Sequence, residues 1–387
     1  MKIKGLLKDL LGSFRLLKMR KKEIKEASEH EIPDDVITNL AKELHPGRIT
    51  AIVSDIKQET KDSKRIRLSS PLIPYFPAGT YLSLTLKIGE SLLNRSYSII
   101  TSPIKAYENK YVEIIVKDYK DGFVSSYLNH ELKVNDEIEV EIGLGQFYYM
   151  EYRDKKDLVA IAGGVGITPF ISMAHDIIDR NLDLTLTILY GSENPNEIIA
   201  KEELENLHDE RIKVINVISG NYQTDYEKGF INKIIIEKYT KKDSSFFICG
   251  PKIMFDNVIK ELGKMDIDLR RIRKESFPIS DITKEEGFDS KLIDKTFNIE
   301  VHQGILITNI KAKANESIAT ALERSGLKIH TACKAGECGF CRLHILKGTY
   351  FIPNSHDYRR YTDKEFNYVH ACVTYPTSDL IIKINLD

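Results

Sequence analysis

The sequence lacks the features that mark several classes of protein. Its 387 residues include no tryptophan, only five cysteines, and no apolar run of the about 18 residues that a membrane-spanning helix needs. No signal-peptide pattern with a small-residue cleavage site appears, and five cysteines are too few for a disulfide framework. The formal net charge of −1 provides no field that would attract nucleic acid. We therefore expect a cytoplasmic protein without a nucleic-acid partner, in which clustered cysteines favour metal ligands or redox groups.

Residues 1–25 predict a basic amphipathic helix, and we assign residues 1–45 to an N-terminal helical extension. Nine basic residues stand against two acidic ones in residues 1–25. The apolar residues recur at helical spacing: Ile3, Leu6, Leu7, Leu10, Leu11, Phe14 and Leu17. Such a helix could lie peripherally on the anionic inner face of a membrane. Alternatively, its apolar stripe packs on a neighbouring domain or a partner protein.

The rest of the chain predicts a multidomain protein. Residues 46–150 contain short alternating segments such as "RITAIVSDI" and "TYLSLTLKI", which indicate an antiparallel β-barrel. Residues 151–278 alternate strands with helices, expected at 169–180 and in "EIIAKEELENL", and this pattern predicts an α/β domain with a parallel sheet. Residues 279–296 are polar and indicate a linker. Residues 297–387 combine strands with the helical "SIATALERSG" and predict an α+β domain.

Three cysteines lie within nine residues near the end of the chain. Cys333, Cys338 and Cys341 form C-x4-C-x2-C, and Cys372 follows 31 positions later. This is the plant-type spacing of four thiolates around a 2Fe–2S cluster. Zinc usually takes paired C-x2–4-C knuckles, and only one C-x2-C pair is present here. The spacing therefore favours iron over zinc, while a disulfide is disfavoured in this compartment.

Five motifs, in this order, resemble the ferredoxin–NADP reductase superfamily. "RSYSI" resembles its R-x-Y-S motif, "DGFVSSYL" its G-x-V-S element, "IAGGVGITP" its glycine-rich nucleotide loop, and "FFICGPKIM" its C-G-P-x-x-M element. "CKAGECGFC" with "ACVTYPTSDL" resembles the plant-type ferredoxin module found at the C-terminus of flavin-dependent reductases, with Lys334 where those modules usually have Arg. The resemblance covers residues 46–387 and implies a flavin barrel, a nucleotide domain, a linker and a β-grasp-like ferredoxin domain.

On the flavin side, the resemblance implies roles for a barrel strand and a later turn. Arg95 would bind a flavin phosphate, Tyr97 would cover one face of the isoalloxazine ring, and Ser98 would hydrogen-bond its reactive nitrogen as a catalytic residue. Gly122 and Ser125 would hold the phosphate at a helix N-terminus. FAD is favoured over FMN because G-x-V-S belongs mostly to FAD-binding members.

The glycine-rich loop lies between a predicted strand and a predicted helix. Gly163, Gly164 and Gly166 would allow a tight turn and the close approach of a pyrophosphate. Thr168 and Pro169 stand where the N-cap and first turn of the helix are expected. A glycine-rich turn that binds no ligand remains the alternative.

The element after the last parallel strand would lie beside the nicotinamide. It contains Cys249, Gly250 and Pro251, with Cys249 implied as a catalytic residue, although a lone cysteine after an apolar strand is often simply buried. Glu193 stands where NADPH-using relatives often place Arg, and its carboxylate would repel a 2′-phosphate. NADH is therefore favoured, and NADPH stays open through three nearby cations: Lys201, Arg211 and Lys213.

The remaining motif is "KESF" at the end of the nucleotide domain. Glu275 and Phe277 resemble the E-x-F of the family, and Phe277 would cover the flavin. His330 and His344 flank the cysteine loop, but four cysteines already complete a ligand set, so we expect structural roles for both histidines.

Together, these motifs predict an NADH-dependent electron-transfer reductase. NADH delivers two electrons as a hydride and a 2Fe–2S cluster accepts one, so flavin, which handles both, stands between them. The resemblance implies an oxygenase, a desaturase or a hybrid-cluster protein as the acceptor. Two alternatives remain: an electron-transfer and docking subunit of a larger or membrane-associated redox complex, and a reductase of small acceptors in which the cluster is secondary.

Overall fold

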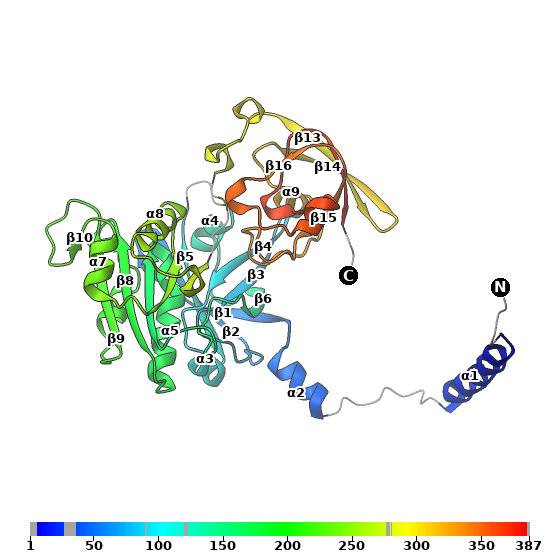
Figure 1. Cartoon of the computed structure of the whole chain (residues 1–387), viewed down its shortest axis with the longest axis horizontal. Coiled ribbons are helices and arrows are strands. Elements are labelled where there is room, and N and C mark those ends of the chain that lie inside the picture. The colour runs from blue at the N-terminus through cyan, green and yellow to red at the C-terminus, as the bar shows by residue number, and fades with distance from the viewer. Residues whose placement is uncertain are drawn as a thin grey trace. The chain divides into compact units, whose positions relative to one another are not determined.

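The chain divides into an N-terminal unit, Met1–His45, and a main unit, Pro46–Asp387. The structure is a computed structural model (Figure 1), and it describes residues 6–26, 36–89, 91–119, 123–275, 279 and 281–384.

Within its described residues, the N-terminal unit forms the helices α1 (Leu6–Glu26) and α2 (Val36–Leu44). Helix α1 is the helix predicted from the spacing of apolar residues. Its side chains of Leu10, Leu11 and Phe14 are exposed. In the part of the chain that the structure describes, no helix combines the length and apolar character needed to cross a membrane.

The first sheet of the main unit is antiparallel, with the strand order β4-β3-β6-β1-β2-β5. Its strands are β1 (Arg48–Thr60), β2 (Ser63–Ser69), β3 (Tyr81–Ile88), β4 (Ser91–Ser98), β5 (Tyr111–Lys117) and β6 (Glu137–Leu144), and the helices α3 (Pro103–Asn109) and α4 (Phe123–His130) accompany them. Ile49, Ala51 and Val53 of β1 alternate with exposed residues and enter the core, as a half-buried strand requires. The Ile100 N–H donates to the Glu113 carbonyl oxygen over 2.9 Å, which draws the two edges of the sheet together into the predicted barrel.

The second sheet is parallel, with the order β10-β9-β8-β7-β11-β12. Its strands are β7 (Asp157–Gly163), β8 (Thr185–Ser192), β9 (Ile212–Ile218), β10 (Glu227–Lys228), β11 (Ser245–Cys249) and β12 (Ile272–Glu275), and its helices are α5 (Thr168–Asp179), α6 (Lys201–Glu205), α7 (Lys233–Tyr239) and α8 (Lys252–Gly263). Ala160 and Ile161 of β7 belong to different cores, as expected when helices cover both faces. The strand order reverses beside β7, and ligands of such sheets bind at the carboxyl ends of the strands near this switch point.

One predicted helix is shorter than its sequence pattern indicated. In "EIIAKEELENL" only Lys201–Glu205 is α-helical, and a separate 3-10 turn covers Pro195–Glu197. The break falls at Ala200, whose φ of +54° is a left-handed conformation that a right-handed helix cannot include. The Ala200 N–H instead donates to the Glu59 carboxylate over 2.8 Å.

The third sheet is mixed, with the order β14-β13-β19-β15-β17. Its strands are β13 (Thr296–Gln303), β14 (Leu306–Lys313), β15 (Arg342–Lys347), β17 (Tyr368–His370) and β19 (Leu380–Ile384); beside them lie β16 (Tyr350–Phe351), β18 (Tyr375–Pro376), α9 (Ile318–Arg324) and α10 (Tyr361–Glu365). Strand β13 pairs antiparallel with β14 and parallel with β19, which gives the predicted α+β architecture.

The segment predicted as a linker is packed onto its surroundings where the structure describes it. Ile282 is buried. The Phe288 ring lies 5.9 Å from the Phe351 ring in an edge-on arrangement. Aromatic and apolar contacts therefore hold this connection, and the domain boundaries at 278 and 296 stay predictions.

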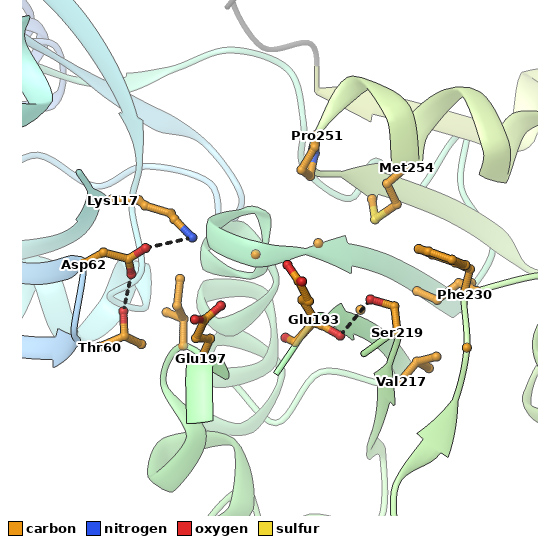
Figure 2. A pocket seen from close by; sticks show the side chains of 17 residues that line it. Thr60, Asp62, Lys117, Glu193, Glu197, Val217, Ser219, Phe230, Pro251 and Met254 are labelled. Carbon is orange, nitrogen blue, oxygen red and sulfur yellow. Dashed lines mark hydrogen bonds and ion pairs between the residues drawn. The ribbon is translucent and has the colours of Figure 1, made fainter. Parts of the chain in front are cut away.

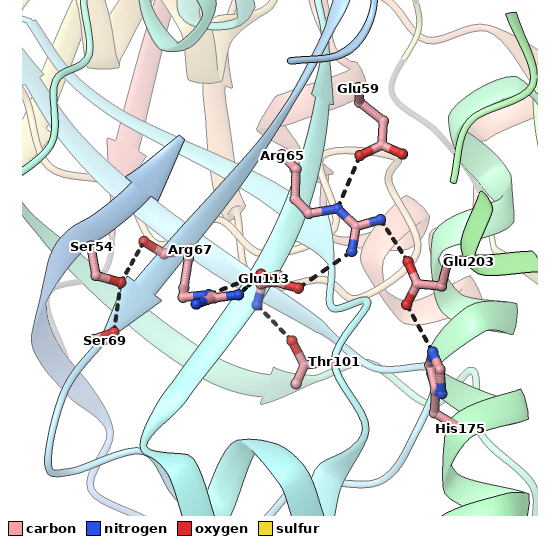
Figure 3. Close-up of polar contacts among 9 residues, drawn as sticks. All are labelled: Ser54, Glu59, Arg65, Arg67, Ser69, Thr101, Glu113, His175 and Glu203. Carbon is pink, nitrogen blue, oxygen red and sulfur yellow. Dashed lines mark hydrogen bonds and ion pairs between the residues drawn. The ribbon is translucent and has the colours of Figure 1, made fainter. Parts of the chain in front are cut away.

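A charge network joins the first two sheets (Figure 3). Arg65 on β2 donates to Glu59 over 3.0 Å and to Glu113 over 3.4 Å. It also donates to Glu203 of α6 over 2.6 Å, and His175 of α5 lies 2.8 Å from the other oxygen of Glu203. The antiparallel barrel and the parallel-sheet domain are thus tied together by a cation surrounded by carboxylates.

Candidate flavin, nucleotide and iron–sulfur site

The four cysteines predicted as iron ligands lie in two pairs. The sulfur atoms of Cys341 and Cys372 are 3.3 Å apart. Cys333 Sγ accepts a hydrogen bond from the Cys338 N–H over 3.4 Å, and the two thiols are also in contact. All four are free thiols. The long sequence gap before Cys372 is closed because β17 pairs with β15, directly after Cys341.

This pairing fits a two-iron cluster. Within the described residues, no three or more His, Cys, Asp or Glu side chains converge as one metal ion would require. A 2Fe–2S cluster takes its thiolates as two for each iron, so paired thiols suit it better than they suit zinc. Gly336 has φ +81°, and a Cβ there would lie 2.6 Å from the His356 carbonyl oxygen, so the loop requires glycine at this position.

The two predicted catalytic residues meet at a third side chain. Ser98 Oγ at the end of β4 donates to Glu275 Oε2 over 3.2 Å. Cys249 Sγ at the end of β11 lies 3.4 Å from the same oxygen atom. Strands β11 and β12 run parallel, with Cys249 opposite Glu275. The structure therefore gathers Ser98, Cys249 and Glu275 at the carboxyl edge of the second sheet.

Glu275 lies at the centre of this group, and sequence reasoning gave it no role. Burial raises its pKa, hydrogen bonds from Cys249 and Ser98 partly offset that rise, and the resulting pKa is about 7. Burial also raises the pKa of the Cys249 thiol well above its ordinary value, so the thiol stays protonated and donates. Only the "KESF" motif marked Glu275 in the sequence. Its contacts link residues 177 and 26 positions apart, which no local pattern reveals.

Arg95 makes a contact that its predicted role did not include. Its Nη1 donates to the Asn94 carbonyl oxygen over 2.7 Å and to Glu323 Oε2 of α9 over 3.2 Å. Both of these hydrogen bonds to described residues use Nη1. The other two nitrogens of the guanidinium are left for a flavin phosphate. Next to it, Ser96 Oγ donates to the Ala332 carbonyl oxygen, beside the first cysteine of the loop.

Of the other residues predicted to bind the flavin, the structure describes two. Tyr97 is half-buried and packs against the barrel core. Ser125 lies in the first turn of α4, where its hydroxyl accepts the Tyr119 N–H over 3.3 Å. Gly122 and Phe277 lie outside the described residues.

The glycine-rich loop packs closely against β11 at one glycine and is open at another. At Gly166 a Cβ would lie 2.3 Å from the Cys249 carbonyl oxygen, so glycine lets the loop pack against the end of β11. Gly164 has φ +54° with nothing within 4 Å of a Cβ position, so its backbone is open to a ligand. The predicted N-cap was wrong: Thr168 is the first residue of α5 and Ile167 precedes it as the cap, because the Thr168 hydroxyl donates to the Val165 carbonyl oxygen over 2.9 Å. Pro169 lies in the first turn of α5, as predicted from the sequence.

A cavity of about 240 Å³ opens at the carboxyl edge of the parallel sheet (Figure 2). It is smaller than the ~300–1,000 Å³ of pockets that enclose a drug-sized ligand, so it suits one part of a dinucleotide. Gly163, Gly164, Glu193 and Pro251 line it, and Cys249 and Gly250 do not. Glu193 and Ser219 both line this cavity.

The cavity offers little to a 2′-phosphate. Of the lining residues that the structure describes, Lys117 is the one cation, and it is paired with Asp62 over 3.1 Å. Arg211 is held by Asp209, and Lys201 and Lys213 lie over tyrosine rings. None of these three lines the cavity.

Comparison with known proteins gives matches along the whole main unit. Three family models match in succession: the oxidoreductase FAD-binding domain at residues 50–149, the oxidoreductase NAD-binding domain at 160–260, and the 2Fe-2S iron-sulfur cluster binding domain at 306–377. A plasma membrane-associated coenzyme Q6 reductase of Saccharomyces cerevisiae is 30% identical over 240 residues, which are 57% of this chain and 74% of that protein.

This chain belongs to the ferredoxin–NADP reductase superfamily. A second relative, the glycine betaine monooxygenase reductase subunit of Chromohalobacter salexigens, is 26% identical over 357 residues, which are 87% of this chain and 95% of the relative. The solved structure of a phthalate dioxygenase reductase has the same fold, with a TM-score of 0.67 and 21% identity, and covers 88% of this chain and 98% of that one. Members with this combination of domains are NAD(P)H-dependent oxidoreductases, and this chain binds FAD, a nicotinamide dinucleotide and a 2Fe–2S cluster.

Proposed function

We propose that this chain accepts a hydride from NADH and delivers single electrons through its cluster to an oxygenase. One observation carries the proposal: strand β4 contacts both the nucleotide edge and the cysteine loop, and a flavin would lie between these two regions. Ser98 of β4 donates to Glu275 at the nucleotide edge, while Ser96 donates to Ala332 beside Cys333. A flavin on β4 would therefore lie between nicotinamide and iron. The relatives that are reductases of glycine betaine monooxygenase and phthalate dioxygenase support an oxygenase as the acceptor.

The residues at the nucleotide edge would orient the reacting groups and hold a proton. FAD, when bound, supplies the chemistry that takes up two electrons together and releases them singly. Ser98 and Cys249 both approach Glu275 Oε2, so these three groups form one hydrogen-bonded set. Because the pKa of Glu275 is about 7, its carboxyl group can hold or release a proton at neutral pH. Arg95 and Ser125 would hold the flavin phosphate.

NADH rather than NADPH is the proposed donor. The Glu193 carboxylate at the cavity would accept a hydrogen bond from a ribose 2′-hydroxyl and would repel a 2′-phosphate. The pairing of Lys117 with Asp62 supports this choice, because it leaves no unpaired cation among the described residues that line the cavity.

The experiment that tests the electron path removes one thiol. Cys338→Ser should retain NADH-driven reduction of ferricyanide, which can take electrons from flavin, and should lose NADH-driven reduction of cytochrome c. His330→Gln, an exposed neighbour of the loop, is the control and should retain both activities. If Cys338→Ser still reduces cytochrome c at the normal rate, electrons do not need the cluster, and the chain is instead a reductase of small acceptors.

The N-terminal unit supports a second, separate proposal: helix α1 contacts an anionic membrane surface. The basic excess of residues 1–25 and the exposed Leu10, Leu11 and Phe14 favour such a surface. Deleting residues 1–25 should leave ferricyanide reduction intact and abolish sedimentation with phosphatidylserine vesicles. Sedimentation that survives the deletion, or that never occurs, contradicts the membrane proposal, and a partner that co-purifies through residues 1–25 at high salt would favour the docking-subunit alternative.

A further inference from the structure

One buried carboxylate receives cations from two different domains. Glu323 lies in the last turn of α9, with 1% of its side chain exposed. Arg95 of β4 donates to Glu323 Oε2 over 3.2 Å. Lys334 donates to Glu323 Oε1, and the Thr331 hydroxyl lies 3.4 Å from the same oxygen. The carboxylate thus joins the flavin strand to the iron–sulfur loop.

This position is unfavourable for a carboxylate unless the cations are present. The negative end of the helix dipole lies at the last turn of α9, so an acidic side chain there is repelled. Burial of an unpaired charge costs several kcal/mol, and only paired cations offset that cost. Lys334 is nearly as buried as Glu323, with 9% of its side chain exposed, and Arg95 is 28% exposed. A glutamate at this position does not stabilise α9 itself, and its presence is explained by the pairing with Arg95 and Lys334.

Both neighbours of Cys333 are held by this arrangement. Lys334 follows the cysteine with φ +56°, a strained left-handed conformation, and its side chain returns to Glu323. Ala332 precedes the cysteine, and its carbonyl oxygen accepts from Ser96 of β4. Ser91 at the other end of β4 donates to the Arg324 carbonyl oxygen over 3.4 Å. Strand β4 is therefore in contact with α9 and with the loop around Cys333.

We propose that Glu323 is a positioning residue for electron transfer between flavin and cluster. By holding Arg95 and Lys334 together, it fixes the Cys333 side of the cluster against β4. Arg95 uses a single nitrogen for Glu323, so the same guanidinium can hold a flavin phosphate and fix the cluster loop at once. The inference rests on the proposed function, which assigns β4 to the flavin. It identifies Cys333 as the ligand held next to that strand.

Glu323→Gln in the full-length holoprotein tests the proposal, with Glu316→Gln as the matched control. Among the described residues, Glu316 pairs only within its own domain, with Arg324 over 2.7 Å. In material with matched iron and flavin content, anaerobic stopped-flow after mixing with NADH separates flavin reduction from cluster reduction. We expect Glu323→Gln to slow cluster reduction by about tenfold, less than the about 10²-fold that a full 1 Å misplacement can cost, with flavin reduction unchanged. Glu316→Gln should match the wild type in both steps.

Hydrogen–deuterium exchange separates a role between domains from one within the ferredoxin domain. Loss of the contact should speed exchange in both residues 91–98 and residues 327–335. Faster exchange in 327–335 alone, or a normal rate of cluster reduction in iron-loaded Glu323→Gln, overturns the proposal. If wild-type protein failed to reduce its cluster with NADH, the proposed function would fail, while exchange in 91–98 would still decide whether Glu323 joins the domains.

Discussion

The two charge clusters that join the flavin barrel to its neighbours have opposite designs. Toward the nucleotide domain, a cation, Arg65, is surrounded by the carboxylates of Glu59, Glu113 and Glu203 (Figure 3). Toward the ferredoxin domain, a carboxylate, Glu323, is surrounded by the cations Arg95 and Lys334.

The difference shows what each cluster can influence. The residues around Arg65 belong to no predicted cofactor motif, so that cluster acts on stability. Both cations at Glu323 belong to cofactor motifs: Arg95 lies in "RSYSI" and Lys334 in the cysteine loop. A change at Arg65 should therefore alter how strongly two domains associate, and a change at Glu323 should alter how fast electrons move.

The largest effect on stability is expected from Arg65→Met. It leaves three partly buried carboxylates without their shared cation, and breaking such a set should lower the free energy of unfolding by about 3 kcal/mol. The control is Arg67→Met, because Arg67 is 40% exposed and forms its ion pair with Glu113, so the substitution should cost below about 1 kcal/mol. Urea unfolding of both variants measures the difference. Equal costs would contradict a special role for Arg65, and a changed cluster EPR spectrum in Arg65→Met would contradict the separation of the two clusters.

Glu203→Gln sharpens the same comparison through pH. Burial alone would raise the pKa of Glu203, but the His175 hydrogen bond and Arg65 lower it to about 2. Because the folded-state pKa is depressed, the stabilisation is present above pH 4.5 and is lost as pH falls toward 2. After a discount for partial exposure, the free energy of unfolding of the wild type should exceed that of Glu203→Gln by about 2 kcal/mol at pH 7. This difference should disappear as the pH falls toward 2. A gap that is constant from pH 7 to pH 3 would contradict this origin.

Glu275 provides the opposite case, a half-buried carboxylate with no cation in contact among the described residues. Its pKa is raised to about 7, so its contribution to stability is present below pH 4.5 and is lost as pH rises through 7. Glu275→Gln should be more stable than the wild type at pH 8 by about 1–2 kcal/mol, with no gain at pH 4. In the wild type, the rate of flavin reduction by NADH should change with an inflection near pH 7, and Glu275→Gln should lose this inflection. A retained inflection would assign that titration to another group.

The smallest effect is expected where a cation is added to the nucleotide cavity, in which the described lining residues include no unpaired cation. Glu193→Arg should improve the ratio of kcat/KM for NADPH over NADH by about tenfold, because the guanidinium would pair with a 2′-phosphate. Glu197→Gln, another residue of the cavity lining, serves as the control and should leave the ratio within about twofold. An unchanged ratio in Glu193→Arg would remove Glu193 from the list of specificity residues.

The two clusters also show what the sequence could and could not predict. Strands and helices followed local periodicity, so "IKVINVI" and "SIATALERSG" were correctly assigned as a strand and a helix. Motif order predicted the three domains because each motif is continuous in sequence. The roles assigned to Arg95, Ser98 and Cys249 remain predictions, although the structure brings Ser98 and Cys249 together.

What the sequence missed depends on contacts between distant segments. Glu323 looks like an ordinary helix residue, and its link to Arg95 spans 228 positions. Arg65 looks like one of several polar residues on an alternating strand. Helix α6 begins only after Ala200, although the helical pattern starts earlier in the sequence, because Glu59, 141 positions away, binds the Ala200 N–H. No local rule contains such information, whereas the folded sheets impose it.

The central claim is that electrons pass from the flavin on β4 into iron held by Cys333, Cys338, Cys341 and Cys372. Anaerobic mixing of iron-loaded holoprotein with one equivalent of NADH, followed by rapid freezing and EPR, tests it most directly. The account predicts bleaching of the flavin absorbance together with the rhombic signal of a reduced 2Fe–2S cluster. Bleached flavin with no cluster signal at any freezing time would contradict it.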